Sequence, residues 1–298
     1  MARPAPSVAR TVALLDFLAL HRGEAFSLSQ LAHHLELNKA TAHAMLSALT
    51  EAAYLVRHPV EKVYTLGPAL VAVGDAAAAT RPIEVTQFAR EAMRSLVDEF
   101  GVQCTASAAL GSSIVILACS GAPEPLSFTV QVGQRLPFVP PLGTVFVAWS
   151  SPAEIDTWLR RVGASAREEE LERYRAALAT VRQRGYSVGL EAEARVRLAQ
   201  AITDGEPRLV NLVNELGQGE YLLLDLEHAA SYRLSMLSAP VFGPNGQVEF
   251  ALTLLGFGDP IRSDRLARCA DRLVCATRTV TAAIRGREPR RSPQLLEA

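Results

Sequence analysis

This sequence has very little lysine and no excess of one charge. Only Lys39 and Lys62 are lysines, whereas 28 residues are arginine, and the 30 positive side chains are balanced by 31 aspartates and glutamates. Because the net charge is −1, a contact with nucleic acid would depend on the local placement of positive charge and not on an overall positive field. Residues 1–80 carry six positive and six negative side chains, which weakens a nucleic-acid-binding interpretation of this part without excluding it.

Cysteine and long apolar runs are also scarce. The four cysteines, at positions 104, 119, 269 and 275, form no C-x-x-C pair. A chain of this size needs no disulfides for stability, so we expect reduced thiols. No run approaches the ~18 apolar residues that cross a bilayer, and the first residues lack the apolar core of a signal peptide. These absences predict a cytoplasmic protein without a membrane partner.

The composition that remains is that of a globular protein with two domains. The 298 residues are about twice the ~150 residues of an average domain. Hydrophobic residues make up 49% and charged residues 20% of the chain, which excludes a disordered or fibrous protein.

The pattern of residues 1–67 predicts a winged helix-turn-helix domain. Apolar residues at helical spacing indicate a helix over residues 7–20 after a serine cap. Ser27 and Gln30 form a capping-box pattern for a second helix, and Asn38 is placed to cap a third helix over residues 39–53. Two helices joined by a short turn make a helix-turn-helix. The strand-like segments 54–57 and 62–66 add a hairpin, or wing.

The rest of the chain predicts an α+β fold. Residues 68–81 indicate a linker helix, and residues 82–286 indicate a second domain in which helices alternate with antiparallel strands. We expect helices over 82–100, from 152, over 167–184 and over 263–285, strands over 102–110, 113–120, 126–132, 232–242 and 247–257, and a proline-rich loop over 135–142. Asn245-Gly246 favours a tight turn between the last two strands. Residues 190–230 are the least regular stretch, and residues 287–298 are predicted to be a flexible tail.

The third helix of the first domain is the candidate DNA-reading element. The leading end of such a helix enters the major groove, so short side chains and hydrogen-bond donors are expected there, with basic wing residues on phosphates. The residues that we predict at the DNA face are Ser27, Ser29, Lys39, Ala40, Thr41, His43, Ser47, Arg57 and Lys62. An ordinary three-helix packing unit without DNA is the alternative from the pattern alone.

Four segments, residues 13–74, 132–149, 178–193 and 237–257, resemble in order the sequences of the IclR family of bacterial transcriptional regulators. The first segment, which begins ALLDFLALHRGEAFSLSQLAHHLELNKATAHAML, resembles the winged-helix domain of that family. The others (VGQRLPFVPPLGTVFVAW, LATVRQRGYSVGLEAE and LSAPVFGPNGQVEFALTLLGF) resemble its effector domain. The resemblance implies a GAF-like ligand-sensing domain, a homodimer or tetramer, a double-stranded DNA operator as partner, and a role such as that of a repressor.

The chain also departs from the family pattern. Ala40 and Ala44 stand where the family usually has Ser and Arg on the reading helix, which removes a hydroxyl and a cation. A ligand sensor or scaffold that has lost specific DNA binding is therefore the second hypothesis. Residues 190–230 look like an insertion relative to the family.

The resemblance also places an effector pocket in the second domain. The predicted pocket residues are Phe138, Gly143, Thr144, Phe146, Gly189, Met236, Thr253 and Leu255. Gly189, Met236 and Leu255 offer few partners to a carboxylate, and an ionised carboxylate is strongly disfavoured when it is buried without donors. An apolar or aromatic small-molecule effector is therefore expected, with a plain core and a closed pocket as the alternative.

An enzyme hypothesis rests on Gly185-Tyr186-Ser187-Val188-Gly189, which matches G-x-S-x-G. A nucleophile elbow needs a strand before the serine and a helix after it. Here the predicted order is reversed, so a serine hydrolase is a distant third hypothesis and no catalytic residue is predicted. His33, His34 and His43 lack the spacing of metal ligands, so neither a metal nor another cofactor is expected.

Overall fold

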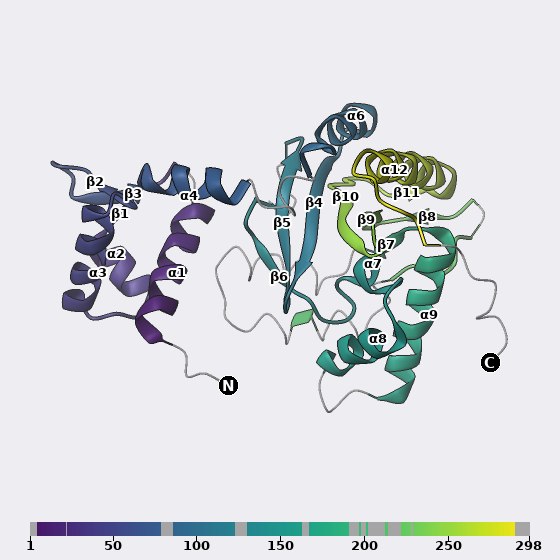
Figure 1. Cartoon of the computed structure of the whole chain (residues 1–298), viewed down its shortest axis with the longest axis horizontal. Coiled ribbons are helices and arrows are strands. Elements are labelled where there is room, and N and C mark those ends of the chain that lie inside the picture. Colours follow the sequence, from purple (N-terminus) through teal and green to yellow (C-terminus); the bar gives the residue numbers. More distant parts are fainter. Residues whose placement is uncertain are drawn as a thin grey trace. The chain divides into compact units, whose positions relative to one another are not determined.

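The computed structural model describes residues 5–21, 23–78, 86–122, 130–162, 167–190, 222–227 and 229–289, together with residues 197, 201, 212 and 213. The contacts divide the chain into two units, Met1–Thr80 and Arg81–Ala298 (Figure 1). This is one division, after residue 80. The finer predicted division stays a prediction: a head of residues 1–67, a linker of 68–81 and a second domain of 82–286.

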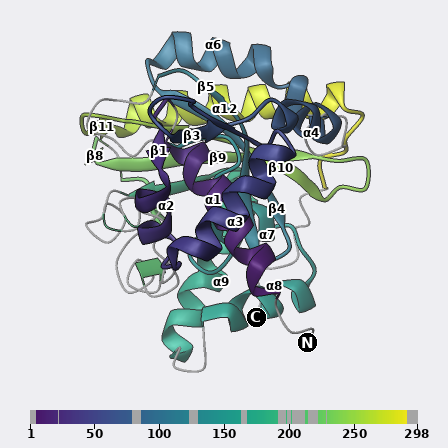
Figure 2. The same ribbon diagram turned by 90° about the vertical axis from the view of Figure 1, so that its left-hand side faces the viewer.

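Unit 1 is a winged helix-turn-helix, as predicted (Figure 1 and Figure 2). Its elements are α1 (Pro6–Leu20), β1 (Phe26–Ser27), α2 (Leu28–His34), α3 (Lys39–Glu51), β2 (Leu55–Arg57), β3 (Val63–Leu66) and α4 (Ala69–Ala78), and the strands pair in the order β1-β3-β2. The buried core consists of Leu14, Leu18, Leu31, Leu46, Leu55 and Tyr64. These residues come from α1, α2, α3 and the wing, so the core holds the reading helix against the rest of the unit.

Unit 2 contains a six-stranded antiparallel sheet with strand order β6-β5-β4-β10-β9-β7. The strands are β4 (Gln103–Leu110), β5 (Ser113–Ser120), β6 (Arg135–Pro137), β7 (Ser187–Leu190), β9 (Leu234–Phe242) and β10 (Val248–Leu255). The short strands β8 (Ser231–Tyr232) and β11 (Ile261–Arg262) pair separately. The antiparallel, GAF-like α+β layout predicted for this part is confirmed.

Helices cover both faces of this sheet. One face packs its alternate residues, such as Ala106, Leu237 and Leu252, against α6 (Arg90–Phe100) and α12 (Ser263–Ala283). The helices α7 (Thr144–Val147), α8 (Pro152–Leu159) and α9 (Glu168–Arg184), with a short 3-10 turn at Arg160–Val162, build a second apolar cluster on the other side, which includes Ala251 (Figure 1). The two faces therefore have separate apolar cores.

Several local predictions need correction. The first helix begins at Pro6, after Ala5, without the predicted serine cap. Residues 88 and 89 form a turn and α6 begins at Arg90, so no continuous helix runs over the predicted range; its start at 82–85 lies outside the described residues. The predicted loop 135–142 contains β6, because Arg135–Pro137 pair with the edge of β5. Residues 130–132 are not a strand, and residues 123–129 of that prediction lie outside the described residues.

Other local predictions are confirmed. Ser27 and Gln30 form the capping box of α2, and the Asn38 side chain accepts from the Thr41 amide. Gly185 ends α9 in the left-handed conformation, at φ 90°. The four cysteines, all within the described part of the chain, form no disulfide.

Candidate functional site

The leading end of α3 is exposed in unit 1. Asn38 Oδ1 accepts a hydrogen bond of 2.9 Å from the Thr41 amide, which fixes the start of the helix. Ala42 and Leu46 face the core. The predicted DNA-face residues of this helix, Lys39, Ala40, Thr41, His43 and Ser47, are all exposed, as is Ala44. The helix therefore presents one continuous face to solvent, starting at its first residue.

The predicted DNA-contacting residues of α2 and of the wing differ in their exposure and in their hydrogen bonds. Ser29 is exposed, whereas Ser27 is half-buried and its hydroxyl takes part in the capping box with Gln30. Arg57 is exposed, and its guanidinium lies 5.7 Å from the centroid of the Tyr64 ring. The Lys62 ammonium donates to the carbonyl of Pro59 within the wing turn. Of the two predicted wing cations, Lys62 is therefore bonded to the wing turn, and Arg57 is the better placed to contact DNA.

A row of hydroxyl side chains crosses the second unit on the sheet face opposite α6 and α12. In the strand register, Thr253 lies opposite both Thr105 and Ser238, and Ser238 lies opposite Ser187. Paired residues of adjacent strands point to the same face. Thr105, Thr253, Ser238 and Ser187 therefore form one line across β4, β10, β9 and β7, which we call the hydroxyl row. All four residues are buried.

One hydrogen bond joins two members of the hydroxyl row, and a second joins the row to Thr144. Ser238 Oγ and Thr253 Oγ1 are 2.8 Å apart, and Thr144 Oγ1 of α7 lies 3.0 Å from Ser187 Oγ. Neither Thr144 nor any of the four residues of the row is charged. The row can exchange hydrogen bonds with a hydroxyl or carbonyl group, but it supplies no cation to neutralise a carboxylate.

The register brings three more predicted pocket residues into one line beside the hydroxyl row. Met236 is paired with Leu255 on one side and with Gly189 on the other. These residues lie two positions along their strands from Ser238, Thr253 and Ser187, so they share the same face. The predicted set of Thr144, Gly189, Met236, Thr253 and Leu255 is therefore brought together. A ligand pocket formed by them stays a prediction.

The other three predicted pocket residues form a packed aromatic group at the start of α7. The Phe138 and Phe146 rings meet edge to face with centroids 6.1 Å apart. Gly143 has φ 91°, and a Cβ atom there would lie 2.5 Å from the Phe138 ring. Arg161 places its guanidinium 5.1 Å from the Phe138 ring centroid and donates to the Phe138 carbonyl. This group belongs to the second apolar cluster and fixes where Thr144 begins the helix.

A half-buried arginine positions the edge strand that carries Ser187. Arg184 donates to the carbonyls of Tyr186 and Leu223, at 2.6 and 2.8 Å. Burial lowers the pKa of the Arg184 guanidinium, and the nearby Tyr186 and Asp225 oppose that shift. Leu223 in turn donates its amide to Val188, and Leu222 bridges to Gly189. The chain thus returns after residue 221 alongside β7.

The position of Ser187 does not fit a catalytic nucleophile. Ser187 begins β7 after the end of α9, is 0% exposed, and has its hydroxyl engaged by Thr144. An elbow serine would instead follow a strand and stand open to substrate. His228, the one downstream histidine, lies outside the described residues. Among the described residues there is also no group of three or more His, Cys, Asp or Glu side chains arranged to hold a metal ion.

Ser187, Ser238 and Thr105 are candidate site residues that were not predicted from the sequence. A sequence signal existed for Ser238 alone, since a two-residue turn at Asn245-Gly246 would place Thr253 opposite it. That pairing is observed, but the structure reaches it with a turn in which the Gly246 amide donates to the Gly243 carbonyl, followed by a register shift between Val248 and Phe250. No comparable local signal relates Thr105 or Ser187 to this hairpin.

Comparisons with known proteins identify both units. Residues 7–59 match the family model of the IclR helix-turn-helix domain, and residues 77–204 match that of the bacterial transcriptional regulator IclR C-terminal domain. A search of curated proteins finds no significant match. Within the described residues, no helix is long and apolar enough to cross a membrane.

Solved structures show the same fold at low sequence identity. An IclR transcriptional regulator from Alicyclobacillus acidocaldarius has 20% identity and a TM-score of 0.62, over 95% of this chain and 100% of that one. The Thermotoga maritima IclR has 14% identity and a TM-score of 0.61, over 93% and 98% of the two chains. An IclR homolog from Microbacterium hydrocarbonoxydans, in complex with 4-hydroxybenzoate, has 17% identity and a TM-score of 0.61, over 94% and 99%.

The two family models describe the parts of a DNA-binding regulator, and regulators of this kind are not enzymes. This finding and the buried hydroxyl of Ser187 together remove the serine hydrolase hypothesis. The chain belongs to the IclR family of bacterial transcriptional regulators.

Proposed function

We propose that this regulator binds a specific operator through α3 and that a small effector at the hydroxyl row changes its affinity for that operator. The observation that carries the proposal is the exposed face of α3, which begins at Lys39 and continues through Thr41, His43 and Ser47. In a helix-turn-helix this end of the second helix contacts base edges, while the preceding helix crosses the backbone. Arg57 of the wing supplies a phosphate contact. Because DNA is the target, the cytoplasm is the compartment we propose.

A homodimer is proposed as the binding form. Val8 and Val12 of α1 are 60% and 49% exposed, and Val71 and Val73 of α4 are 73% and 50% exposed. Apolar side chains in two helices of one small unit are expected to be covered by a second copy. A symmetric dimer reads two half-sites about 34 Å apart, or a multiple of that distance, so the operator is expected to be pseudo-palindromic. Sedimentation of the purified chain distinguishes this dimer from a tetramer or a monomer.

The proposed effector is a small molecule with an apolar or aromatic body and a hydroxyl or carbonyl group. The hydroxyls of Thr253 and Ser238 offer hydrogen bonds, while Met236, Leu255 and Gly189 offer an apolar surface. Because the row supplies no cation, uncharged phenols and hydroxybenzamides are the first compounds to test, with 4-hydroxybenzoate, the ligand in the Microbacterium hydrocarbonoxydans homolog, as the charged comparison. A ligand that prefers one arrangement of the two heads shifts operator affinity by its differential affinity, typically about 1 to 3 kcal/mol.

A ligand sensor without specific DNA binding remains the second candidate. Ala40 and Ala44 are exposed on α3, so two positions of the reading face carry no polar group. The balanced charge of residues 1–80 also favours a sensor without specific DNA binding.

A quantitative gel shift tests the two candidates. The full chain is titrated onto the DNA upstream of its own gene at low and at physiological salt, with unrelated DNA of equal length as the control. We expect a discrete complex that survives physiological salt on the upstream DNA only, since specific sites are bound at least about 10³-fold more tightly than non-specific ones. Equal binding to both DNAs, or binding lost in both at physiological salt, would favour the sensor.

A further inference from the structure

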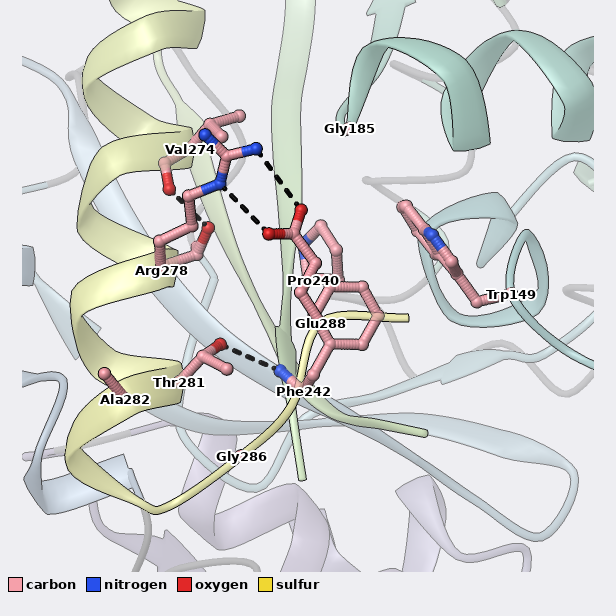
Figure 3. A pocket seen from close by; sticks show the side chains of 11 residues that line it. Trp149, Gly185, Pro240, Phe242, Val274, Arg278, Thr281, Ala282, Gly286 and Glu288 are labelled. Atoms are coloured by element: carbon pink, nitrogen blue, oxygen red, sulfur yellow. Dashed lines mark hydrogen bonds and ion pairs between the residues drawn. The ribbon is translucent and has the colours of Figure 1, made fainter. Parts of the chain in front are cut away.

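A cavity of about 210 Å³ lies at the end of β9 in unit 2 (Figure 3). Its walls come from α12, from Pro240 and Phe242 of β9, from Trp149 after α7, and from the segment that follows α12. The eight residues predicted for the effector pocket are all absent from its eleven lining residues. The cavity is therefore a separate site from the hydroxyl row.

The side of the cavity facing α12 is apolar and aromatic. Trp149 and Phe242 meet edge to face, with ring centroids 5.2 Å apart and an angle of 82° between the rings. Pro240 extends this surface, and Val274 of α12 is a further apolar lining residue. The volume is below the roughly 300–1,000 Å³ of pockets for drug-sized ligands, so the occupant that fits is about the size of one aromatic ring.

One guanidinium faces this apolar wall. Arg278 is the only positive residue among the lining residues, and Glu288 is the only negative one. Arg278 Nε lies 3.3 Å from Glu288 Oε2, and Arg278 Nη2 donates to Glu288 Oε1 at 3.3 Å. Figure 3 shows both contacts, so the two groups meet as a two-pronged pair. Both distances are long for a charge-assisted pair, and the side chains are 53% and 41% exposed.

Backbone contacts of Gly286 and Arg287 hold the segment before Glu288 in place. The Gly286 amide donates to the Thr281 carbonyl at 2.7 Å, and the Arg287 amide donates to the Gly243 carbonyl at 3.1 Å. A Cβ atom on Gly286 would lie 1.7 Å from the Phe242 carbonyl oxygen, so the segment passes the strand at a point where only glycine fits. These contacts of residues 286 and 287 also show that the predicted tail is docked where it begins. The segment would stay docked if the Glu288 carboxylate were removed.

We propose that this cavity binds a small aromatic or apolar monocarboxylate, and that Glu288 is an internal carboxylate that occupies Arg278 until the ligand replaces it. The ligand's carboxylate takes the two guanidinium contacts, because this fork matches carboxylate geometry. Its ring lies against Trp149, Phe242 and Pro240. Glu288 then turns to solvent at little cost, since an exposed ion pair contributes little to stability. The site is independent of the effector and operator proposals.

Benzoate, with benzamide as its uncharged control, tests this proposal on the full chain. The chain has two tryptophans, so the indole NMR signals of Trp149 and Trp158 are assigned with Trp149→Phe, and the Trp149 signal is followed during titration. Benzoate is expected to shift it in a saturable way, whereas benzamide is not. The Glu288→Gln variant should bind benzoate about twofold to fivefold more tightly, because the competing carboxylate is gone. The Arg278→Gln variant should lose the response.

The matched control is Arg268→Gln, which removes an exposed arginine of the same helix that is not among the lining residues. It should behave like the unaltered chain. The proposal is overturned if benzoate leaves the Trp149 signal unchanged in the Glu288→Gln variant, if benzamide shifts it equally, or if Arg278→Gln and Arg268→Gln have the same effect. A benzoate response that only Thr253→Val abolishes would assign the binding to the hydroxyl row and would also overturn it.

Discussion

Thr144 Oγ1 and Ser187 Oγ lie 3.0 Å apart in a fully buried position, and their hydrogen bond joins the first residue of α7 to the first residue of the edge strand β7. The same serine lies at one end of the hydroxyl row, opposite Ser238. A motif that suggested a nucleophile is therefore part of the packing that fixes the candidate effector face.

Replacing one partner of this pair should cost more than replacing both. Thr144→Val leaves the Ser187 hydroxyl buried without a partner, so we expect the free energy of unfolding to fall by about 1–3 kcal/mol. The double variant Thr144→Val with Ser187→Ala should recover most of that loss, because no buried polar group remains unsatisfied. Urea unfolding measures both, with Thr144→Ser as the control that keeps the hydroxyl. Additive losses in the double variant would contradict a direct hydrogen bond.

Gly143 has to be glycine for two reasons that can be separated. Its φ is 91°, and a Cβ atom would lie 2.5 Å from Phe138; Gly111 has φ 62° with open space around it. Gly111→Ala should therefore cost only the left-handed backbone penalty, about 1–2 kcal/mol. Gly143→Ala should cost about 1–3 kcal/mol more, because Phe138 has to move. Equal losses in thermal unfolding would mean that the Phe138 contact is not limiting.

His34, which lies beside Phe17, is expected to make the stability of unit 1 depend on pH. The His34 and Phe17 ring centroids are 3.8 Å apart. Burial lowers the pKa of His34, and repulsion from His21 and His33 lowers it further. The folded state therefore favours neutral His34, while the unfolded chain takes up a proton near pH 6.5. Stability is complete above about pH 6.5 and declines as the pH falls through that value toward the folded pKa.

The measurement is an NMR titration of the imidazole signals in the full chain, with His34→Gln to assign the His34 signal. A midpoint below about 6.5 is expected. In hydrogen exchange, unit 1 of the His34→Gln variant should lose less protection between pH 7.5 and 5.5 than the unaltered chain. A His34 midpoint above 6.5, or equal losses of protection, would contradict the effect.

Met236 is the position at which a larger side chain would most directly block the proposed effector site. It is half-buried in the line beside the hydroxyl row, between Gly189 and Leu255. Met236→Trp should fill the space in front of Gly189, and should remove most of the effector's influence on operator affinity, which is expected to be about 5- to 150-fold, while leaving ligand-free DNA binding unchanged. The control is Leu110→Trp, at an exposed strand end on the opposite face. Loss of DNA binding in Met236→Trp alone would indicate misfolding and not a blocked pocket.

Local signals were enough for much of the fold. The capping box at Ser27 and Gln30, the Asn38 cap and the Gly185 stop each depend on a few neighbouring residues, and each is observed. The strand β6 was missed because its pairing partner, not its proline-containing sequence, makes Arg135–Pro137 a strand.

The site was less predictable because it depends on register between distant strands. Thr105, Thr253 and Ser187 are brought into one row by pairing across four strands, and no local pattern specifies that order. The resemblance to a family pointed to Thr253, Met236 and Gly189, but not to the serines between them. The cavity beside Arg278 is lined by residues 149, 185, 240–242 and 274–288, which are four stretches far apart in the sequence, so no local pattern predicts it.

The central claim is that the leading end of α3 contacts DNA, and salt dependence measures it directly. Anisotropy titrations of an operator duplex at several salt concentrations compare the unaltered chain with Lys39→Ala, and with Arg94→Ala as a control on the exposed face of α6 in unit 2. Lys39→Ala should weaken binding and reduce the slope of log K against log salt by about one, the change for one lost phosphate contact, while Arg94→Ala should change neither. Unchanged affinity and slope in Lys39→Ala would contradict the claim.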